Sequence, residues 1–279
     1  MRIGLHVSIA GKIYEAIDRA EELGCETIQV FSRNPRGWEA KPLDPEDTAE
    51  FRKRKETAGI FPVLVHIPYI INLATPDAKL RQKSIAAYIE DLGRTDALGA
   101  EYFVTHPGSH TGSGERAGIK HFTDSLNAVL EKAKPECMVL LENTAGSGSN
   151  LGYAFGHIKS IIDGIKDKKR IGVCFDTEHA YGARYDVSTK KGLEETLGEF
   201  DRLVGIEMIK AVHFNDSKAK LASGVDRHEH IGKGFIGKEG MKRIINHPRL
   251  RHLPFIMETP KKKPADDIMN MKTARSLCK

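Results

Sequence analysis

The sequence contains few cysteines and no long hydrophobic run, and both absences narrow the class of protein. Only four cysteines occur among 279 residues, and no two of them form a C-x-x-C pair. We therefore expect reduced thiols in a cytoplasmic protein, rather than a disulfide framework or a zinc ribbon. The longest apolar runs, such as residues 61–67, are too short to cross a bilayer, so no membrane span is expected. The N-terminus begins directly with strand-like sequence, which predicts no signal peptide.

A strong excess of one charge is also absent. Apolar residues make up 40% of the chain and charged residues 29%, a balance that excludes a disordered protein. The formal net charge of +5 permits a polyanionic partner such as nucleic acid without requiring one. No linker or break in composition divides the chain. We therefore expect one domain over residues 1–279. We also expect a monomer, although no feature of the sequence determines the oligomeric state.

Short apolar runs rich in β-branched residues recur along the whole chain. Each run is almost continuously hydrophobic, as in the strands of a parallel sheet that is covered on both faces. Amphipathic helical patterns lie between the runs, where apolar residues follow the i, i+3, i+4, i+7 spacing. The predicted strands are residues 2–7, 27–31, 62–67, 102–106, 138–142, 171–176, 211–214 and 255–258.

The number and spacing of these repeats predict the fold. Eight strand–helix repeats in 279 residues average roughly 35 residues each, a usual size for a βα unit. Eight parallel strands with eight helices close into a TIM (β/α)8 barrel, which is the α/β architecture we predict. A doubly wound open sheet is the structural alternative. Such sheets usually carry a Gly-rich phosphate loop after the first strand, and residues 7–11 (VSIAG) do not form one.

The chemistry of a TIM barrel lies at the C-terminal ends of its strands, and six successive predicted strands end in His, Asp or Glu. None of them ends in Lys or Arg, although the 43 basic residues outnumber the 38 acidic ones. Six such groups converging on one mouth would repel one another or stay unsatisfied, so we predict that cations hold them. The six residues are His66, His106, Glu142, Asp176, His213 and Glu258.

Two loops are expected to add ligands at the same mouth. His179 follows the strand-end Asp176 by three positions, and Asp226 and His228 lie two apart, so that they can point the same way from extended chain. A mixture of imidazole and carboxylate without thiolate suits Zn²⁺, with Mn²⁺ or Fe²⁺ as substitutes. A lone strand-end histidine is more often structural, so the prediction depends on the convergence. Nine ligands predict two or three ions.

Several short motifs surround these residues, and together they are highly specific. They are residues 106–110 (HPGSH), 142–146 (ENTAG), 148–152 (GSNLG), 213–218 (HFNDSK), 226–228 (DRH), 231–234 (IGKG) and 258–259 (ET). At these motifs, and over nearly its whole length, the chain resembles the endonuclease IV family of AP endonucleases, also called deoxyribonuclease IV.

The resemblance implies that the nine residues hold about three zinc ions on a xylose-isomerase-like barrel, with Glu142 bridging the first two ions. The implied groups are His66, His106 and Glu142 for the first ion, Glu142, Asp176, His213 and Glu258 for the second, and His179, Asp226 and His228 for the third.

The resemblance also implies an activity in DNA repair. The substrate would be double-stranded DNA with an abasic site, cut 5′ to the lesion to leave a 3′-hydroxyl and a 5′-deoxyribose phosphate. Two ions would lower the pKa of a shared water to give a bridging hydroxide, and Glu142 would be the catalytic residue that helps to orient it. Arg36, Tyr69 and Ile70 match the family positions that enter the base stack, where such side chains unstack and bend DNA.

The chain departs from the family pattern at a few positions. Glu178 stands between Thr177 and His179, where the family more often has cysteine. Turned inward, this carboxylate could alter the second or third ion; turned outward, it would be neutral. Pro68 and Ile70 also differ from common family choices.

Two other functions stay open on the residues alone. A metal-dependent sugar isomerase or epimerase of the xylose-isomerase-like group shares strand-end His, Asp and Glu, but usually holds two metals. The third ligand group therefore favours the nuclease. A metal-stabilised DNA-binding protein without catalysis would bind the lesion without cleaving it, and a full ligand set would then be idle.

Overall fold

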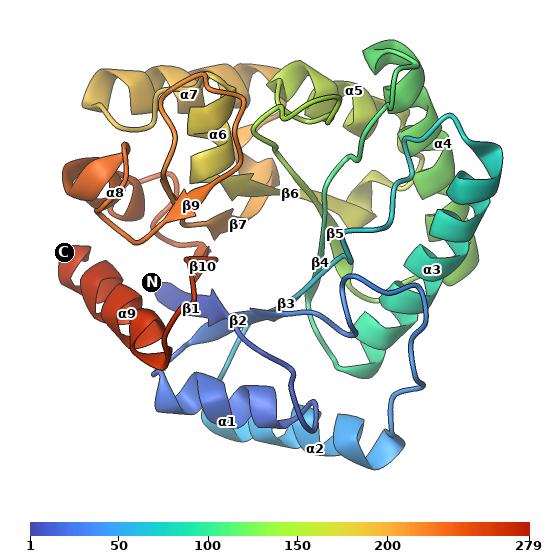
Figure 1. The fold of residues 1–279 in the computed structure, drawn as a ribbon, viewed down its shortest axis with the longest axis horizontal. Coiled ribbons are helices and arrows are strands. Elements are labelled where there is room, and N and C mark those ends of the chain that lie inside the picture. The colour runs from blue at the N-terminus through green and yellow to red at the C-terminus, as the bar shows by residue number, and fades with distance from the viewer.

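Eight parallel strands close into a barrel, which confirms the TIM barrel predicted from the sequence (Figure 1). The computed structural model describes residues 1–279. The barrel strands are β1 (Arg2–His6), β2 (Thr27–Val30), β3 (Val63–His66), β4 (Tyr102–Thr105), β5 (Met138–Glu142), β6 (Ile171–Asp176), β7 (Ile209–His213) and β10 (Pro254–Met257). β1 pairs with both β2 and β10, so the sheet has no free edge.

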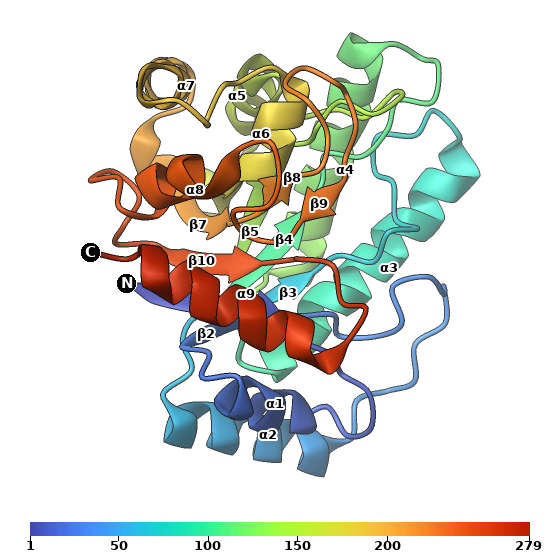
Figure 2. The ribbon, with the colours of Figure 1, turned by 60° about the vertical axis from the view of Figure 1, so that its left-hand side comes forward.

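Helices surround the barrel and cover its outer face (Figures 1 and 2). A core of 62 buried residues lies between the two layers. No helix combines the length and the apolar character that a bilayer span requires. The α-helices are α1 (Glu15–Glu22), α2 (Pro45–Ala58), α3 (Ala78–Ala97), α4 (Glu115–Ala133), α5 (Phe155–Gly164), α6 (Thr177–Ala183), α7 (Lys190–Leu203), α8 (Gly237–Ile245) and α9 (Pro264–Leu277), and short 3₁₀ turns occupy Lys168–Arg170 and Ile206–Met208.

Local sequence explains where the helices begin and end, as α2 illustrates. Asp44 accepts hydrogen bonds from the backbone N–H groups of Glu46 and Asp47, and Pro45 occupies the first turn. Gly59 ends the helix in the left-handed conformation at φ 65°, which a residue with a side chain adopts only with strain. The chain then turns directly into β3.

Inward-facing side chains on six strands form a small, fully buried apolar cluster in the barrel. The cluster is separate from the large core outside the sheet. Because side chains alternate along a strand, the residues two positions further on point into the barrel as well. Those residues are the six strand-end His, Asp and Glu. The cluster consists of Leu64, Val104, Leu140, Cys174, Ala211 and Ile256.

The barrel carries two additions at its C-terminal mouth. The short helix α6 follows β6 directly, ahead of the longer α7. After β7, a two-stranded antiparallel ribbon is formed by β8 (Asp216–Ser217) and β9 (His228–Glu229). His179 therefore lies on a helix, and the expectation of a loop at this point was wrong. The reason is that Asp176 caps this helix, its Oδ1 accepting a hydrogen bond from the His179 N–H at 2.8 Å.

Candidate metal centre

The six strand-end residues meet at the C-terminal mouth of the barrel. Their positions follow from the parallel register, in which, for example, Asp176 of β6 lies beside His213 of β7. Glu142, Asp176 and His213 are fully buried, although each is polar or charged. Burying such groups costs free energy unless they are paired with partners or metal ions. These residues therefore require partners inside the barrel.

Glu142 lies at the centre of two groups of possible ligands. Its Oε2 is 3.3 Å from His66 Nε2 and 3.0 Å from His106 Nε2. Its Oε1 is 2.8 Å from His213 Nδ1, which is 3.3 Å from Glu258 Oε2. Within each group, one ligand atom per residue lies within 4.8 Å of all the others. The groups are His66, His106 and Glu142, and Glu142, Asp176, His213 and Glu258.

A third group of ligand-type residues lies between α6 and the ribbon. His179 Nε2 is 3.3 Å from Asp226 Oδ2, and His228 Nε2 is 3.6 Å from Asp226 Oδ1. Asp226 stands at the edge of the group, with 48% of its side chain exposed. The compact set in which every residue is within 4.8 Å of the others is Asp176, Glu178, His179 and His228. Glu178 is fully buried and is thus turned inward.

Three histidines of the site are held through Nδ1, and in His179 this nitrogen also lies 3.2 Å from Glu142 Oε1. The Nδ1 atoms of His66, His179 and His228 face backbone carbonyls, those of Ile67 at 2.7 Å, Asn143 at 2.9 Å and Glu258 at 2.9 Å. When Nδ1 donates to a carbonyl, Nε2 is left with a lone pair directed at the carboxylates. Such a partner behind the ring is a regular feature of metal-binding histidines.

Amide side chains complete the support of the site, and sequence reasoning missed them. Gln29 Oε1 lies 2.8 Å from His213 Nε2, which leaves Nδ1 for the ligand group. Asn215 donates to Asp176 Oδ2 at 2.7 Å and accepts from the Glu258 N–H. Asn143 exchanges two hydrogen bonds with the backbone of Asp176. Gln29 lies in a strand without a strand-end signal, whereas the asparagines belong to motifs that the resemblance had singled out.

Another buried carboxylate ties the ribbon to the chain that follows it. Asp216 accepts hydrogen bonds from the backbone N–H groups of Ser217, Gly234, Ile236 and Gly237. A Cβ at Gly234 would lie 2.3 Å from the carbonyl oxygen of Ser217, so only glycine fits there. This explains the glycine of the IGKG motif in physical terms. The chain after β9 is therefore held in one arrangement.

Opposite charges at the site shift the pKa values of its members. Burial opposes the ionisation of Glu142, but His213 and His106 hold its pKa well below the ordinary value. Burial likewise opposes a charge on His179, yet Asp176 and Asp226 raise its pKa well above the ordinary value. Against partial burial, His179 lowers the pKa of Asp226 to about 2. In the metal-free protein, protons on the histidines thus balance the carboxylates, and metal ions would displace them.

Two buried polar atoms of the expected ligands indicate whether the site suits metal ions. Glu142 Oε2 and His228 Nε2 are buried and make no hydrogen bond in the protein, although other ligand atoms lie as near as 3.0 Å and 3.6 Å, respectively. Native proteins rarely leave such atoms without partners. The donor set is all imidazole and carboxylate, and the nearest buried cysteine, Cys174, belongs to the apolar cluster below. These residues fit divalent ions of the zinc type.

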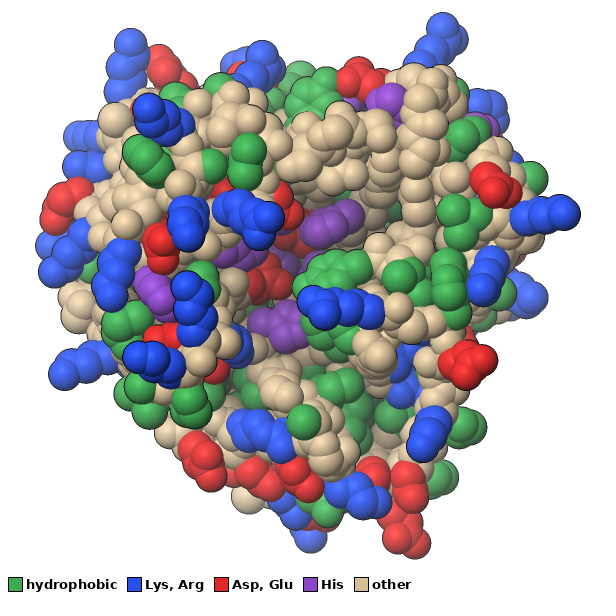
Figure 3. All heavy atoms as spheres, in the orientation of Figure 1, with side chains coloured by type: hydrophobic (Ala, Val, Ile, Leu, Met, Phe, Trp, Pro, Cys, Tyr) green, Lys and Arg blue, Asp and Glu red, His purple; other side chains and the backbone are tan.

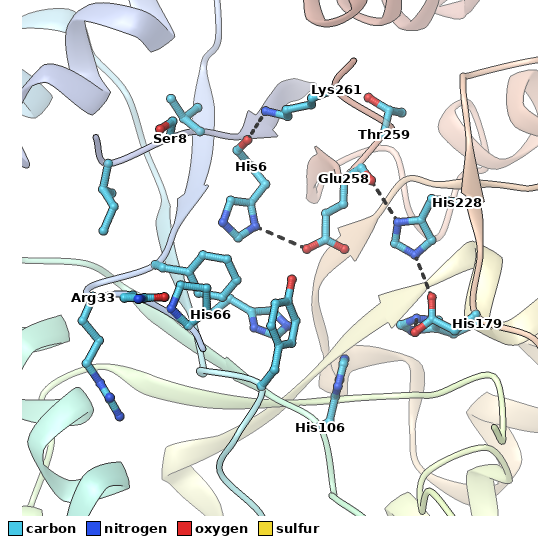
Figure 4. A pocket seen from close by; sticks show the side chains of 17 residues that line it. His6, Ser8, Arg33, His66, His106, His179, His228, Glu258, Thr259 and Lys261 are labelled. Carbon is cyan, nitrogen blue, oxygen red and sulfur yellow. Dashed lines mark hydrogen bonds and ion pairs between the residues drawn. The ribbon is translucent and has the colours of Figure 1, made fainter. Parts of the chain in front are cut away.

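The ligand groups form the floor of an open cavity of about 580 Å³. Figure 3 shows histidine and acidic side chains in a hollow on this face, with lysine and arginine side chains around it. In Figure 4, His6 and Glu258 point toward each other, and His6 Nδ1 lies 3.4 Å from Glu258 Oε1. Lys261 reaches the same cavity, where it donates to the His6 carbonyl. The sequence alone predicts only a solvated charge run at residues 261–263.

The three residues expected to contact DNA lie near the cavity in different settings. Tyr69 lines the cavity and is 62% exposed, with its ring 5.4 Å from that of Phe31. Partial burial and nearby carboxylates raise the pKa of Tyr69 to about 12, so the phenol is neutral. Arg36 is exposed, and the Tyr69 N–H donates to the carbonyl of the preceding Pro35. Ile70 is half-buried and packs against the core.

The loop that carries Arg36 is fastened to α3 by buried ion pairing. Arg33 donates to both carboxylate oxygens of Asp91, at 2.7 and 2.9 Å. The same guanidinium reaches the carbonyls of Gly37 and Trp38. Arg94 donates to the backbone oxygen of Ser32. Arg33 and Asp91 are almost fully buried, so this rim of the cavity is held from within.

Comparison with known proteins assigns the family. The family described as the xylose isomerase-like TIM barrel matches residues 17–276. Probable endonuclease 4 of Methanoculleus marisnigri is 46% identical over 276 residues, covering 99% of this chain and 98% of that protein. Probable endonuclease 4 of Halothermothrix orenii is also 46% identical, over 94% of each chain. The chain belongs to the endonuclease IV family.

Solved structures agree with this assignment. The crystal structure of endonuclease IV from Thermus thermophilus is similar with a TM-score of 0.89 and 36% identity, over 99% of this chain and 98% of that one. A D-tagatose 3-epimerase-like protein matches with a TM-score of 0.72 but only 17% identity. The second likeness concerns the fold alone, so the endonuclease IV resemblance is confirmed and the epimerase alternative gains no support in sequence.

Proposed function

We propose that this member of the endonuclease IV family is a DNA-repair hydrolase that cuts the phosphodiester bond 5′ to an abasic site. The meeting of three ligand groups at the barrel mouth carries the proposal. Membership of the family supplies the class of reaction, since relatives named endonuclease 4 match over nearly the whole chain. The proposed products are a 3′-hydroxyl and a 5′-deoxyribose phosphate.

Three zinc ions are the proposed cofactors. His66, His106 and Glu142 would hold the first, and Glu142 would share the second with Asp176, His213 and Glu258. His179, Asp226 and His228 would contribute to the third. Divalent ions in such sites lower the pKa of a water and neutralise the charge on phosphoryl oxygens, which removes the two main obstacles to phosphodiester hydrolysis.

The chain's own residues would prepare that reaction. Glu142 presents its two oxygens to two different ligand groups, which makes it the proposed catalytic residue. Gln29 and the backbone carbonyls behind the histidine rings would retain one ring proton, so that the other nitrogen is the one that gives up its proton to a metal ion. Hydrolysis forms a bond from the water oxygen to phosphorus as the bond from phosphorus to the 3′ oxygen breaks. Both events would take place at the floor of the cavity.

The rim would select the lesion. Tyr69 is neutral, exposed and backed by Phe31, so it can enter a base step without carrying charge into the stack. Arg36 lies on the neighbouring loop, and its exposed guanidinium suits a phosphate or a displaced base. Basic side chains around the hollow favour the DNA backbone, so we expect binding to weaken with salt.

The proposal is tested by incubating the purified protein with two duplexes that differ only by one abasic site. We expect a cut immediately 5′ to the abasic site, no cut in the intact duplex, and loss of cutting after treatment with a chelator. Zn²⁺ added back should restore the activity. Analysis of the product ends distinguishes hydrolysis from β-elimination, which leaves no 3′-hydroxyl.

Other outcomes would point to the alternatives. Binding to the abasic duplex without any cut, at full metal content, would indicate a DNA-binding protein. Metal-dependent epimerisation of a ketose with no nuclease activity would indicate the sugar epimerase. Elemental analysis of the same preparation should find about three ions per chain, given that zinc sites take three or four protein ligands and that Glu142 is shared.

A further inference from the structure

Glu178 lies against the third ligand group although no role has been assigned to it. It occupies the second position of α6, between the two expected ligands Asp176 and His179. Its side chain is fully buried, and one of its oxygens lies within 4.8 Å of ligand atoms of Asp176, His179 and His228. Most residues of α6 are buried, and a glutamate is almost never fully buried unless its charge is paired. Its position inside the molecule therefore needs a physical cause.

The two oxygens of this carboxylate have different surroundings. Oε1 accepts hydrogen bonds from the Ser217 hydroxyl at 3.0 Å and from the Arg227 N–H at 3.2 Å. Oε2 is buried and has no hydrogen-bond partner. Oε1 thus ties α6 to both sides of the ribbon region. These hydrogen bonds explain the burial of Oε1 but not that of Oε2. An ionised oxygen left alone in the interior costs much more free energy than a neutral one.

His228 contains a second buried atom that has no hydrogen-bond partner. Its Nδ1 is held by the Glu258 carbonyl, whereas its Nε2 is buried and has no hydrogen-bond partner. Glu178 and His228 are both members of the compact group of four residues. The group therefore contains a carboxylate oxygen and an imidazole nitrogen that are buried and make no hydrogen bond. Both are atom types that commonly bind zinc.

The negative charge of this group also favours a cation at the third site. Asp176 and Glu178 are both carboxylates in this group, and Asp226 lies beside it. Like charges this close need a balancing positive charge, which the protonated histidines supply in the metal-free protein and which a metal ion would supply on displacing those protons. The backbone N–H groups of His179 and Arg227 each reach one oxygen of this pair, but neither reaches Glu178 Oε2.

We propose that Glu178 is an additional ligand of the third metal ion, through Oε2. The proposal builds on the three-ion site proposed above. The ion would then be held from the interior by Glu178, on the side away from the cavity, whereas Asp226 closes the site from its half-exposed edge. With Glu178, five carboxylates surround the cluster in place of four, which reduces the positive charge that meets the DNA phosphate. Glu178 also keeps its hydrogen bonds to the ribbon through Oε1.

The test is stepwise metal binding by metal-free protein, measured as Zn²⁺ titrations against a competing chromophoric chelator. Glu178→Gln is the decisive variant, because its amide oxygen can still accept from Ser217 and Arg227, whereas the ionised Oε2 is gone. We expect two binding steps to match the wild type and the third to weaken by at least about 10-fold, the lower end of what supporting groups at metal sites contribute. The gain in melting temperature on adding Zn²⁺ should shrink in parallel.

Two further variants make the result specific. Glu195→Gln removes an exposed carboxylate on α7 and should leave all three steps unchanged. Glu178→Asp keeps the charge but withdraws the oxygens by one methylene, so the third step should weaken here as well. Melting curves of the metal-free variants show whether each one folds, and Glu178→Asp replaces Glu178→Gln if the latter does not.

The outcomes separate this inference from the proposed function. If the wild type binds three ions and Glu178→Gln binds all three with the same affinities, Glu178 is not a ligand, and the proposed function stands. If only Glu178→Asp behaves like the wild type, the carboxylate acts by its charge and direct ligation is wrong. If the wild type binds fewer than three ions, the three-ion site itself is refuted and the inference falls with it.

Discussion

Two layers of side chains lie one above the other inside the barrel, and they are stabilised in opposite ways. The lower layer is the apolar cluster that includes Leu140 and Ile256, fully buried and complete through packing alone. The upper layer, two residues further along the same strands, includes Glu142 and Glu258 and leaves buried polar atoms without partners. The step between them is only about 7 Å, since a strand rises about 3.3 Å per residue. Position along a strand therefore decides whether a side chain serves the fold or the site.

The largest effect should follow from neutralising the upper layer at its centre. Glu142→Gln keeps the volume but loses the charge that both inner ligand groups share. We expect single-turnover cleavage of abasic duplex to fall by about 10²–10⁴-fold, as is usual when a positioned charged group is lost. Equilibrium binding of the same duplex should survive or tighten, because one negative charge facing the phosphate is gone. Cleavage near the wild-type rate would show that the shared carboxylate is not catalytic.

A cavity in the lower layer should reduce the stability of the fold without reducing the number of bound metal ions. Leu140→Ala empties a fully buried position beneath Glu142, and we expect about 2–5 kcal/mol of lost unfolding free energy. The number of bound ions should stay the same, because no ligand is touched. Urea unfolding and elemental analysis measure the two quantities on one preparation. Ile268→Ala, at a position 60% exposed, is the control and should change stability by less than about 0.5 kcal/mol. Loss of metal without loss of stability would contradict the separation of the layers.

A smaller effect is expected at the rim above both layers. Tyr69→Ala should weaken binding of abasic duplex by about 10-fold, within the range that aromatic stacking on a base contributes, and should change the rate of the saturated complex less. Phe61→Ala removes another exposed aromatic ring, at the opposite end of β3, and should leave binding unchanged. Unaltered affinity in Tyr69→Ala would mean that this ring only packs in its loop.

The smallest expected effect concerns pH in the metal-free protein. The pKa values of His179 and His213 are raised above 6.5 in the folded state, because burial is outweighed by neighbouring carboxylates at His179 and by Cys174 and carboxylates at His213. Their stabilising contribution is complete below pH 6.5 and is lost as the pH rises through the raised values. His6, whose pKa is lowered by burial, finishes titrating below that window. The melting temperature of chelated protein should therefore fall as the pH rises above 6.5, and that of zinc-loaded protein should not. Parallel curves for both forms would refute this electrostatic account.

The sequence was most informative where a repeated apolar run ended in His, Asp or Glu. Eight apolar runs defined the barrel, and the residue type at the end of each run identified the upper layer, because a parallel barrel brings all strand ends together. The sequence was less informative about α6, which was expected as a loop. Its seven residues are too few for an amphipathic pattern, and its start is set by the side chain of Asp176, which is also an expected ligand.

The supporting residues could not be predicted for a different reason. Gln29 and Asn215 act across strands that are distant in the sequence, on His213 and on Asp176 and Glu258. An amide has no preferred spacing to its partner, so no pattern in one sequence predicts the pair. Glu178 illustrates the same limit, since both an inward and an outward orientation were open until its neighbours on the ribbon were known.

If the Arg36 loop meets DNA as proposed, its fastening to α3 would affect how quickly a lesion is found. Arg33 is held in place by Asp91, so the loop adopts its arrangement when the protein folds, not when it meets DNA. Loops that order only on contact lose conformational entropy at that moment, which weakens every encounter alike, productive or not. A rim that is already ordered lets the protein sample many intact base steps at little cost and stop only where the duplex yields. Search along undamaged DNA would then be limited by the stiffness of the DNA and not by that of the protein.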